Sequence, residues 1–83
     1  MNKRELGLRI KSFRKEKGLS QKELASLMGY KDVSTIAKIE TGVNDVTTET
    51  LYKLADILSV SVFDILDIKE ILHKMYRILF SLI

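Results

Sequence analysis

The chain has 83 residues, of which 46% are hydrophobic and 30% charged, a composition typical of one small globular domain and unlike that of a disordered or collagen-like chain. It contains no cysteine and a single histidine, which excludes a disulfide framework, a cysteine nucleophile and the common zinc-binding spacings. The start MNKREL lacks the apolar segment of a signal peptide, and no apolar run reaches the ~18 residues that cross a bilayer. We therefore expect a cytoplasmic protein without metal or cofactor. The sequence shows neither a nucleophile with a neighbouring base nor a phosphate-binding loop, so we do not expect an enzyme.

The charges are distributed unevenly along the chain. Residues 1–38 contain ten Lys and Arg against four acidic residues, whereas residues 39–83 contain four against seven. The two parts therefore carry net charges of +6 and −3, which together give the formal +3. A basic part beside an acidic one indicates a surface that meets a polyanion, either nucleic acid or an anionic membrane. A Lys-rich surface that only provides solubility is the third interpretation.

Apolar residues recur at helical spacing through almost the whole chain, and strand-like alternation is not sustained anywhere. The first helix is expected over residues 3–17, with Gly18 as its stop. Ser20 and Glu23 form a capping box that begins a second helix, which Gly29 ends after about two turns.

Four further helices follow from the same start and stop signals. They are expected from Asp32 or Val33 to Glu40 with Gly42 as the stop, from the cap Thr47 to Leu58, from the cap Ser61 to Leu66, and from Ile68 to Ile83. The first five apolar stripes predict these inward residues: Leu6, Ile10, Phe13, Leu24, Ala25, Leu27, Met28, Val33, Ile36, Ile39, Leu51, Leu54, Ala55, Leu58, Val62, Phe63, Ile65 and Leu66. The sequence thus predicts an all-α domain of five or six short helices.

The second and third predicted helices have the spacing of a helix-turn-helix unit, in which the first helix braces the DNA backbone and the second enters the major groove. The outward residues of the third helix are short or basic: Ser34, Thr35, Ala37 and Lys38. Hydroxyl groups can bond base edges or phosphates, and a lysine can reach guanine or phosphate. An ordinary pair of antiparallel helices with a solvated face explains the spacing as well.

Three segments in this region resemble the Cro/C1-type (Xre-like) helix-turn-helix domain of phage and bacterial repressors. They are R-x-x-x-G-L-S-Q-x-E-L-A, S-T-I-x-K-I-E-x-G and E-T-L-x-K-L-A-x-x-L-x-V-S, and the resemblance covers residues 4–66. It implies a five-helix lambda-repressor-like domain over residues 1–67, and the apolar spacing of the rest of the chain predicts an additional amphipathic helix over residues 68–83. The resemblance also implies a sequence-specific regulator of transcription that binds double-stranded DNA, usually as a dimer.

The resemblance implies roles for individual residues. Gln21 matches a position that holds a backbone phosphate, and Ser34, Thr35 and Lys38 match positions that contact bases and nearby phosphates. Val33 and Ala37 flank them and are candidates for contact with thymine methyl groups. The loop from Thr41 to Asn44 matches one whose amides and polar side chains meet the DNA backbone. Arg14 and Glu40 match an ion pair between the first and third helices, so we expect Glu40 to be structural.

The turn over residues 29–33 is one residue longer than in many members of this family. Lys31 is therefore a further candidate for phosphate contact, and Asp32 is a candidate helix cap. No Gln or Arg occupies the leading positions of the third helix. We therefore expect much of the DNA affinity to come from phosphates and DNA shape.

The last predicted helix carries a continuous apolar stripe, formed by Ile68, Ile71, Leu72, Met75, Leu79 and Leu82. At ~1.5–3 kcal/mol per side chain, burying these six is worth roughly 9–18 kcal/mol, which is comparable with the stability of a whole domain, about 5–15 kcal/mol. The stripe can fold back on the other helices, pair with a second copy or lie on a membrane. Pairing is favoured, because a homodimer places a second recognition helix at the next half-site, ~34 Å away. The alternative function is a protein-interaction module, such as an antitoxin or anti-regulator that captures a partner protein with this helix.

Overall fold

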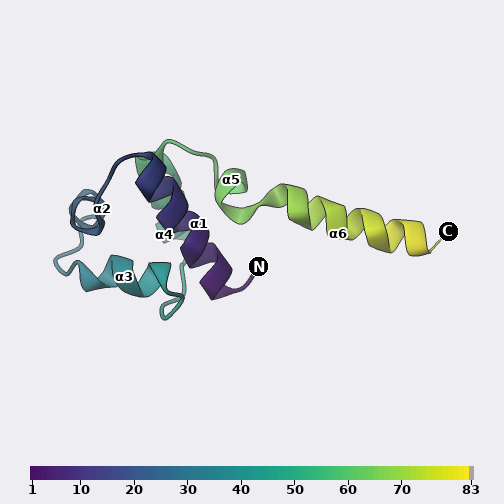
Figure 1. Cartoon of the computed structure of the whole chain (residues 1–83), viewed down its shortest axis with the longest axis horizontal. Helices are drawn as coiled ribbons and strands as arrows, with labels where there is room; N and C mark the ends of the chain where they lie inside the picture. Colours follow the sequence, from purple (N-terminus) through teal and green to yellow (C-terminus); the bar gives the residue numbers. More distant parts are fainter. Residues whose placement is uncertain (83) are drawn as a thin grey trace.

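The computed structural model describes residues 1–82, and for residues 69–71 the backbone alone. Within this part of the chain there are six helices and no strand, which confirms the predicted all-α class (Figure 1). The helices are α1 (Lys3–Glu16), α2 (Gln21–Met28), α3 (Ser34–Glu40), α4 (Thr48–Leu58), α5 (Val62–Leu66) and α6 (Ile68–Ser81). The first five pack together into what we call the body, and α6 extends away from it (Figure 1).

The predicted caps start the helices as expected. The Ser20 hydroxyl accepts a hydrogen bond from the Glu23 amide, and the Glu23 carboxylate accepts one from the Ser20 amide, each at 3.0 Å. Ser61 and Asp64 form the same reciprocal pair at the start of α5, and the Thr47 hydroxyl accepts from the Thr50 amide at the start of α4. These bonds satisfy amide groups that have no partner inside the helix.

The core of the body lies where one stripe of each of the first five helices meets. Its buried hydrophobic residues are Ile10, Leu24, Ala25, Met28, Ile36, Ile39, Leu54, Ala55, Leu58 and Ile65. All ten belong to the stripes predicted from spacing, because a helix with an apolar face gains stability by burying it.

Three predicted core positions are wrong: Leu27, Val33 and Phe63 are 55%, 43% and 63% exposed. Leu27 lies beside the face that α2 buries through its other apolar residues. Val33 precedes α3 and belongs to the turn, so helical spacing does not determine its direction. Phe63 lies on a five-residue helix that buries Ile65 alone.

The start of α6 is attached to the body by Arg9 of α1. The Arg9 Nε donates to the carbonyl of Ile65 at 2.8 Å, and its Nη2 donates to the carbonyl of Asp64. Its guanidinium also forms an ion pair with Asp67, at 3.7 Å. The backbone of Asp67 is left-handed, with φ 52°. The chain therefore changes direction between α5 and α6 at a point that α1 holds in place.

The apolar stripe of α6 does not fold back on the body. Ile68 is half-buried at the base of the helix, whereas Leu72, Met75, Leu79 and Leu82 are each more than half exposed. The side chain of Ile71 lies outside the described residues. None of the helices in residues 1–82 combines the length and the apolarity needed to span a membrane.

Candidate nucleic-acid interface

One side of α3 is fixed in the body and the other is open. Ile36, Ile39 and Glu40 are buried and attach the helix to the core. On the other side, Ser34, Thr35 and Ala37 are half-buried and Lys38 is exposed. The helix therefore presents short side chains and one cation to its surroundings, a shape that the major groove of DNA can admit.

The longer turn before α3 contains a side-chain hydrogen bond to the first residue of the helix. A carboxylate oxygen of Asp32 accepts a hydrogen bond from the Ser34 amide at 2.9 Å. This N–H is also the main reason why the pKa of the Asp32 carboxyl lies below its usual value. Asp32 thus bonds the first amide of α3 but is not its N-cap: α3 begins at Ser34, and the N-cap position is Val33, which forms no side-chain cap.

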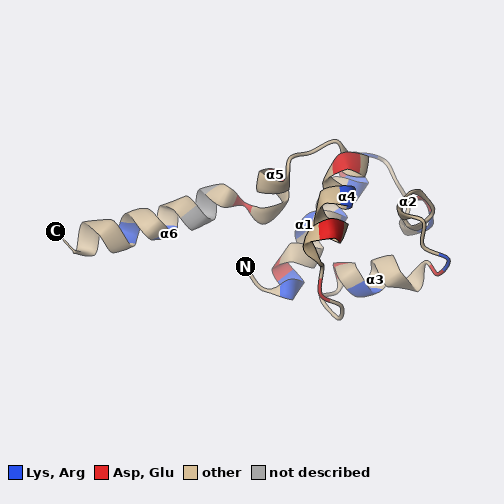
Figure 2. Cartoon of the chain, turned by 180° about the vertical axis from the view of Figure 1, so that it is seen from behind, with Lys and Arg blue, Asp and Glu red and all other residues tan. Residues whose placement is uncertain are grey.

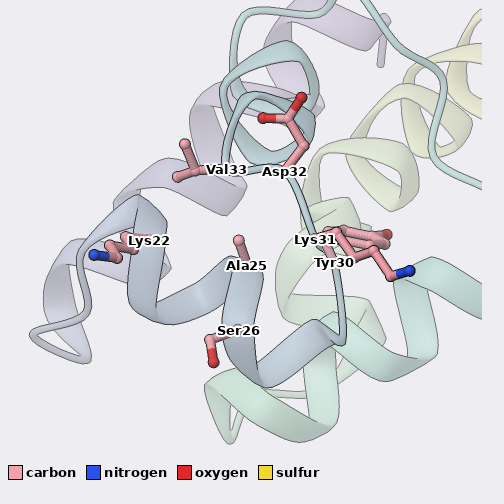
Figure 3. Close-up of a pocket in the computed structure, with 7 residues that line it drawn as sticks. All are labelled: Lys22, Ala25, Ser26, Tyr30, Lys31, Asp32 and Val33. Carbon is pink, nitrogen blue, oxygen red and sulfur yellow. The ribbon is translucent and has the colours of Figure 1, made fainter.

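A hollow of about 390 Å³ lies between α2 and this turn (Figure 3). Lys22 of α2 and Lys31 of the turn both line it, but their amino groups point away from each other (Figure 3). Both lysines are exposed. The Lys31 side chain is therefore open to solvent, and the two cations do not converge on a single ligand.

A buried carboxylate joins the first three helices. Glu40 of α3 accepts two hydrogen bonds from the Arg14 guanidinium of α1, at 2.6 and 3.1 Å. It accepts a third from the side-chain amide of Gln21 at the start of α2, at 3.0 Å. Because an amide nitrogen carries two hydrogens, Gln21 retains one to donate to a phosphate. Arg14 and Glu40 are both buried, so this ion pair belongs to the interior and not to the DNA-facing surface.

The loop after α3 differs from the expectation in one respect. The amides of residues 41–44 all donate to carbonyl oxygens of α3, so in this conformation these amides have no hydrogen left for a phosphate. The Thr41 hydroxyl also donates to the Ala37 carbonyl, at 2.8 Å. Thr41 can therefore only accept further bonds through its oxygen, and Asn44 is the residue of this loop whose side-chain amide can donate to DNA.

Two cations that the sequence analysis did not single out, Arg4 and Lys11, lie beside the predicted contact residues Gln21 and Thr41. Arg4 and Lys11 of α1 line a second hollow, of about 360 Å³, together with Leu8, Gln21, Glu40 and Thr41. We call this hollow the α1–α3 cleft. Basic segments are visible at the start of α1 and on α3 (Figure 2). Residue spacing in α1 marks one stripe of that helix, but it does not show that the stripe meets the end of α3.

Comparisons with known proteins agree with this geometry. A family model described as Helix-turn-helix matches residues 10–65. The crystal structure of the clp gene regulator ClgR from C. glutamicum is 31% identical, with a TM-score of 0.72 over 77% of this chain and 82% of that one. The restriction-modification controller protein C.AhdI from Aeromonas hydrophila is 34% identical, with a TM-score of 0.69 over 75% of this chain and 92% of that one.

A second structure of ClgR, from Corynebacterium glutamicum, is 26% identical and matches 93% of this chain and 88% of its own with a TM-score of 0.73. This share of the chain is larger than residues 1–67 alone provide, so the match includes part of α6. No curated protein sequence gives a match. Since the family model covers well over half of the chain, the protein belongs to the Cro/C1-type helix-turn-helix family of DNA-binding transcriptional regulators.

Proposed function

We propose that the protein is a repressor in the cytoplasm that binds a near-palindromic operator as a homodimer and blocks transcription by occupying the DNA. The observation that carries the proposal is the two-sided character of α3. Its inner side is fixed by Ile36, Ile39 and Glu40, while its outer side is short, hydroxyl-bearing and basic. The protein needs no cofactor and performs no chemistry in this role.

Base contacts come from the outer side of α3. Lys38 reaches guanine O6 and N7 or an adjacent phosphate, and Ser34 and Thr35 bond base edges. The small Ala37 and the exposed Val33 contact thymine methyl groups. Among these residues Lys38 alone can contact both O6 and N7 of a guanine, so base contacts supply only part of the affinity.

Phosphate contacts surround α3 and fix its position in the groove. Their donors are Gln21 at the start of α2, Lys31 in the turn and Asn44 in the loop that follows α3. Thr41 adds no donor there, because its hydroxyl hydrogen is bonded to the Ala37 carbonyl. Such contacts set the register of the protein on the duplex without carrying sequence information.

The dimer is formed by α6. Of its stripe, Leu72, Met75, Leu79 and Leu82 are exposed in the single chain, and pairing with the same residues of a second copy removes them from water. A two-fold axis between two bodies presents two copies of α3, as a near-palindromic operator requires. Residues 1–67 are then the DNA-binding domain, and residues 68–83 the dimerisation element.

The experiment is selection of bound duplexes from a random pool at about 150 mM salt, where nonspecific phosphate attraction is weak. We expect enrichment of a two-fold site whose half-site centres are one helical turn apart. Enrichment of a single half-site would contradict the dimer. Retention without enrichment, lost as the salt concentration rises, would contradict sequence-specific regulation.

The exposed stripe of α6 also favours a second candidate, a protein-interaction module that captures a partner protein as an antitoxin or anti-regulator does. This candidate predicts that the purified chain stays aggregated or heterogeneous until the partner is added. A discrete dimer that selects one operator from the random pool would exclude it.

A further inference from the structure

We propose that the α1–α3 cleft binds one phosphate of the DNA backbone, with Arg4 and Lys11 of α1 as its cationic ligands. The inference rests on the proposed function, because the phosphate belongs to the same duplex that α3 enters. It adds α1 to the DNA-binding surface and assigns two residues to it that no family motif marked.

The cleft is built by close backbone contact between α1 and the end of α3. Gly7 packs against the carbonyls of Ile39 and Glu40, and a Cβ on Gly7 would lie 2.6 Å from the Glu40 oxygen. Gly42, whose φ is +79°, packs against α1 in the same way, and a Cβ there would lie 2.8 Å from the Cα of Arg4. Neither position can hold a side chain without moving backbone. The start of α1 is therefore held against the end of α3 at two points.

Arg4, Leu8 and Lys11 occupy successive positions on one stripe of α1, because residues three and four apart share a helix face. This stripe lines the cleft together with Gln21 at the start of α2 and Thr41 after the end of α3. Gln21 retains one side-chain N–H for the DNA backbone, whereas the Thr41 hydroxyl already donates to Ala37. A phosphate that contacts Gln21 comes within reach of the long cationic side chains of α1.

The charge of the cleft is positive despite the carboxylate in its lining. Glu40 is 3% exposed, and Arg14 and Gln21 occupy both of its oxygens. Among the residues that the structure describes, the ion pairs are Lys3 with Asp45, Arg9 with Asp67 and Arg14 with Glu40. Neither Arg4 nor Lys11 belongs to one of these ion pairs, and each can form charge-assisted hydrogen bonds to phosphate oxygens.

A competing explanation is that the two cations only compensate the negative end of the α3 dipole. The salt dependence of DNA binding separates the two, since each phosphate contact that is lost lowers the slope of log affinity against log salt by about 0.9. We expect Arg4→Gln and Lys11→Gln each to lower the slope by about this amount and the double variant by about twice as much. Between 50 and 200 mM salt, each single variant should lose roughly threefold less affinity than the parent chain.

The losses should be the same on the selected operator and on an unrelated duplex of equal length, because a phosphate carries no sequence information. Lys11→Arg should keep the parent slope. Lys17→Gln is the matched control: it makes the same charge change in a residue just past α1 that instead donates to the Ser59 hydroxyl at 3.1 Å, and its slope should equal that of the parent. Urea unfolding of every variant verifies that the fold is intact.

Equal slopes for Arg4→Gln, Lys11→Gln and Lys17→Gln would overturn the cleft while leaving the proposed function standing, since the parent chain would still select its operator. A parent chain without salt-dependent binding to any duplex would overturn both.

Discussion

Glu40 joins the first three helices through a carboxylate that is almost fully buried. Its carboxylate bonds Arg14 of α1 and Gln21 of α2 from its own position on α3. Arg14 also donates to the carbonyl of Leu19 at 2.8 Å, in the segment between α1 and α2. No buried side-chain nitrogen or oxygen in the described residues lacks a hydrogen-bond partner, so the cost of burying these charges is offset by their bonds.

Replacing Glu40 by Gln should therefore lower the free energy of unfolding by about 3–5 kcal/mol, because the variant leaves the Arg14 charge buried without a counter-ion. Urea unfolding followed by circular dichroism measures the change. The double variant Arg14→Met with Glu40→Leu should recover most of the loss, since no charge then remains buried. A change of less than about 1 kcal/mol for Glu40→Gln would show that the pair is not needed to hold the helices.

Lys38 is the one cation on the open side of α3, so its removal should weaken DNA binding without changing the stability of the fold. Lys38→Ala should cost about 1–3 kcal/mol of operator affinity, measured by titration of a labelled duplex. A loss concentrated at one base pair would assign Lys38 to a base, and a uniform loss would assign it to a phosphate. Lys22→Ala on α2 is the control. Equal affinities of the two variants would contradict a DNA contact by Lys38.

At the scale of an element, the start of α2 depends on the capping box of Ser20 and Glu23. Ser20→Ala removes the hydroxyl that accepts from the Glu23 amide and should cost about 1 kcal/mol of stability. Ser26→Ala changes an exposed serine within the same helix and should leave the stability unchanged or slightly higher, because alanine favours the helix interior. Equal urea midpoints for these two variants would show that α2 does not need its cap.

The same box makes α2 sensitive to acid. The backbone N–H of Ser20, more than its hydroxyl, lowers the pKa of the Glu23 carboxyl below its ordinary value of 4.5. A lowered pKa stabilises the fold above the ordinary value, and this contribution is lost as the pH falls through the lowered pKa. In an NMR titration, the Ser20 amide of the parent chain should therefore shift with a midpoint below 4.5, and in Glu23→Gln this step should be missing.

The elements themselves were largely predictable because their signals are local. Caps such as Ser20 and Thr47 act within three residues, and the buried stripes follow from spacing alone. Val33 and Phe63 escaped the prediction since turn geometry and helix length, rather than periodicity, decide where they point. The α1–α3 cleft was not predictable for a different reason: Arg4 and Lys11 meet Thr41 only after two helices pack, and a single sequence carries no signal for that contact.

For the whole molecule, the main feature is that the exposed apolar residues of α6 have no packing partner within one copy of the chain. The body is complete without α6, as Arg9 holds only the base of the helix. A stripe of large apolar side chains is costly in water, and a second copy removes that cost while supplying the second recognition helix that a palindromic site needs. The assembly and the DNA affinity are therefore expected to depend on the same side chains.

Leu79→Glu should dissociate the dimer, because it places a charge within the paired stripe at a residue that is 58% exposed in the single chain. Sedimentation velocity should then show a monomer of about 9.5 kDa, and affinity for the two-fold operator should fall to that of a single half-site. His73→Glu is the control: it introduces a glutamate on the opposite side of α6, away from the stripe, and should leave the dimer intact. If the two variants sediment alike as dimers, the chain pairs through another surface. If the parent chain is itself a monomer that still selects a two-fold site, the bodies meet only on the DNA.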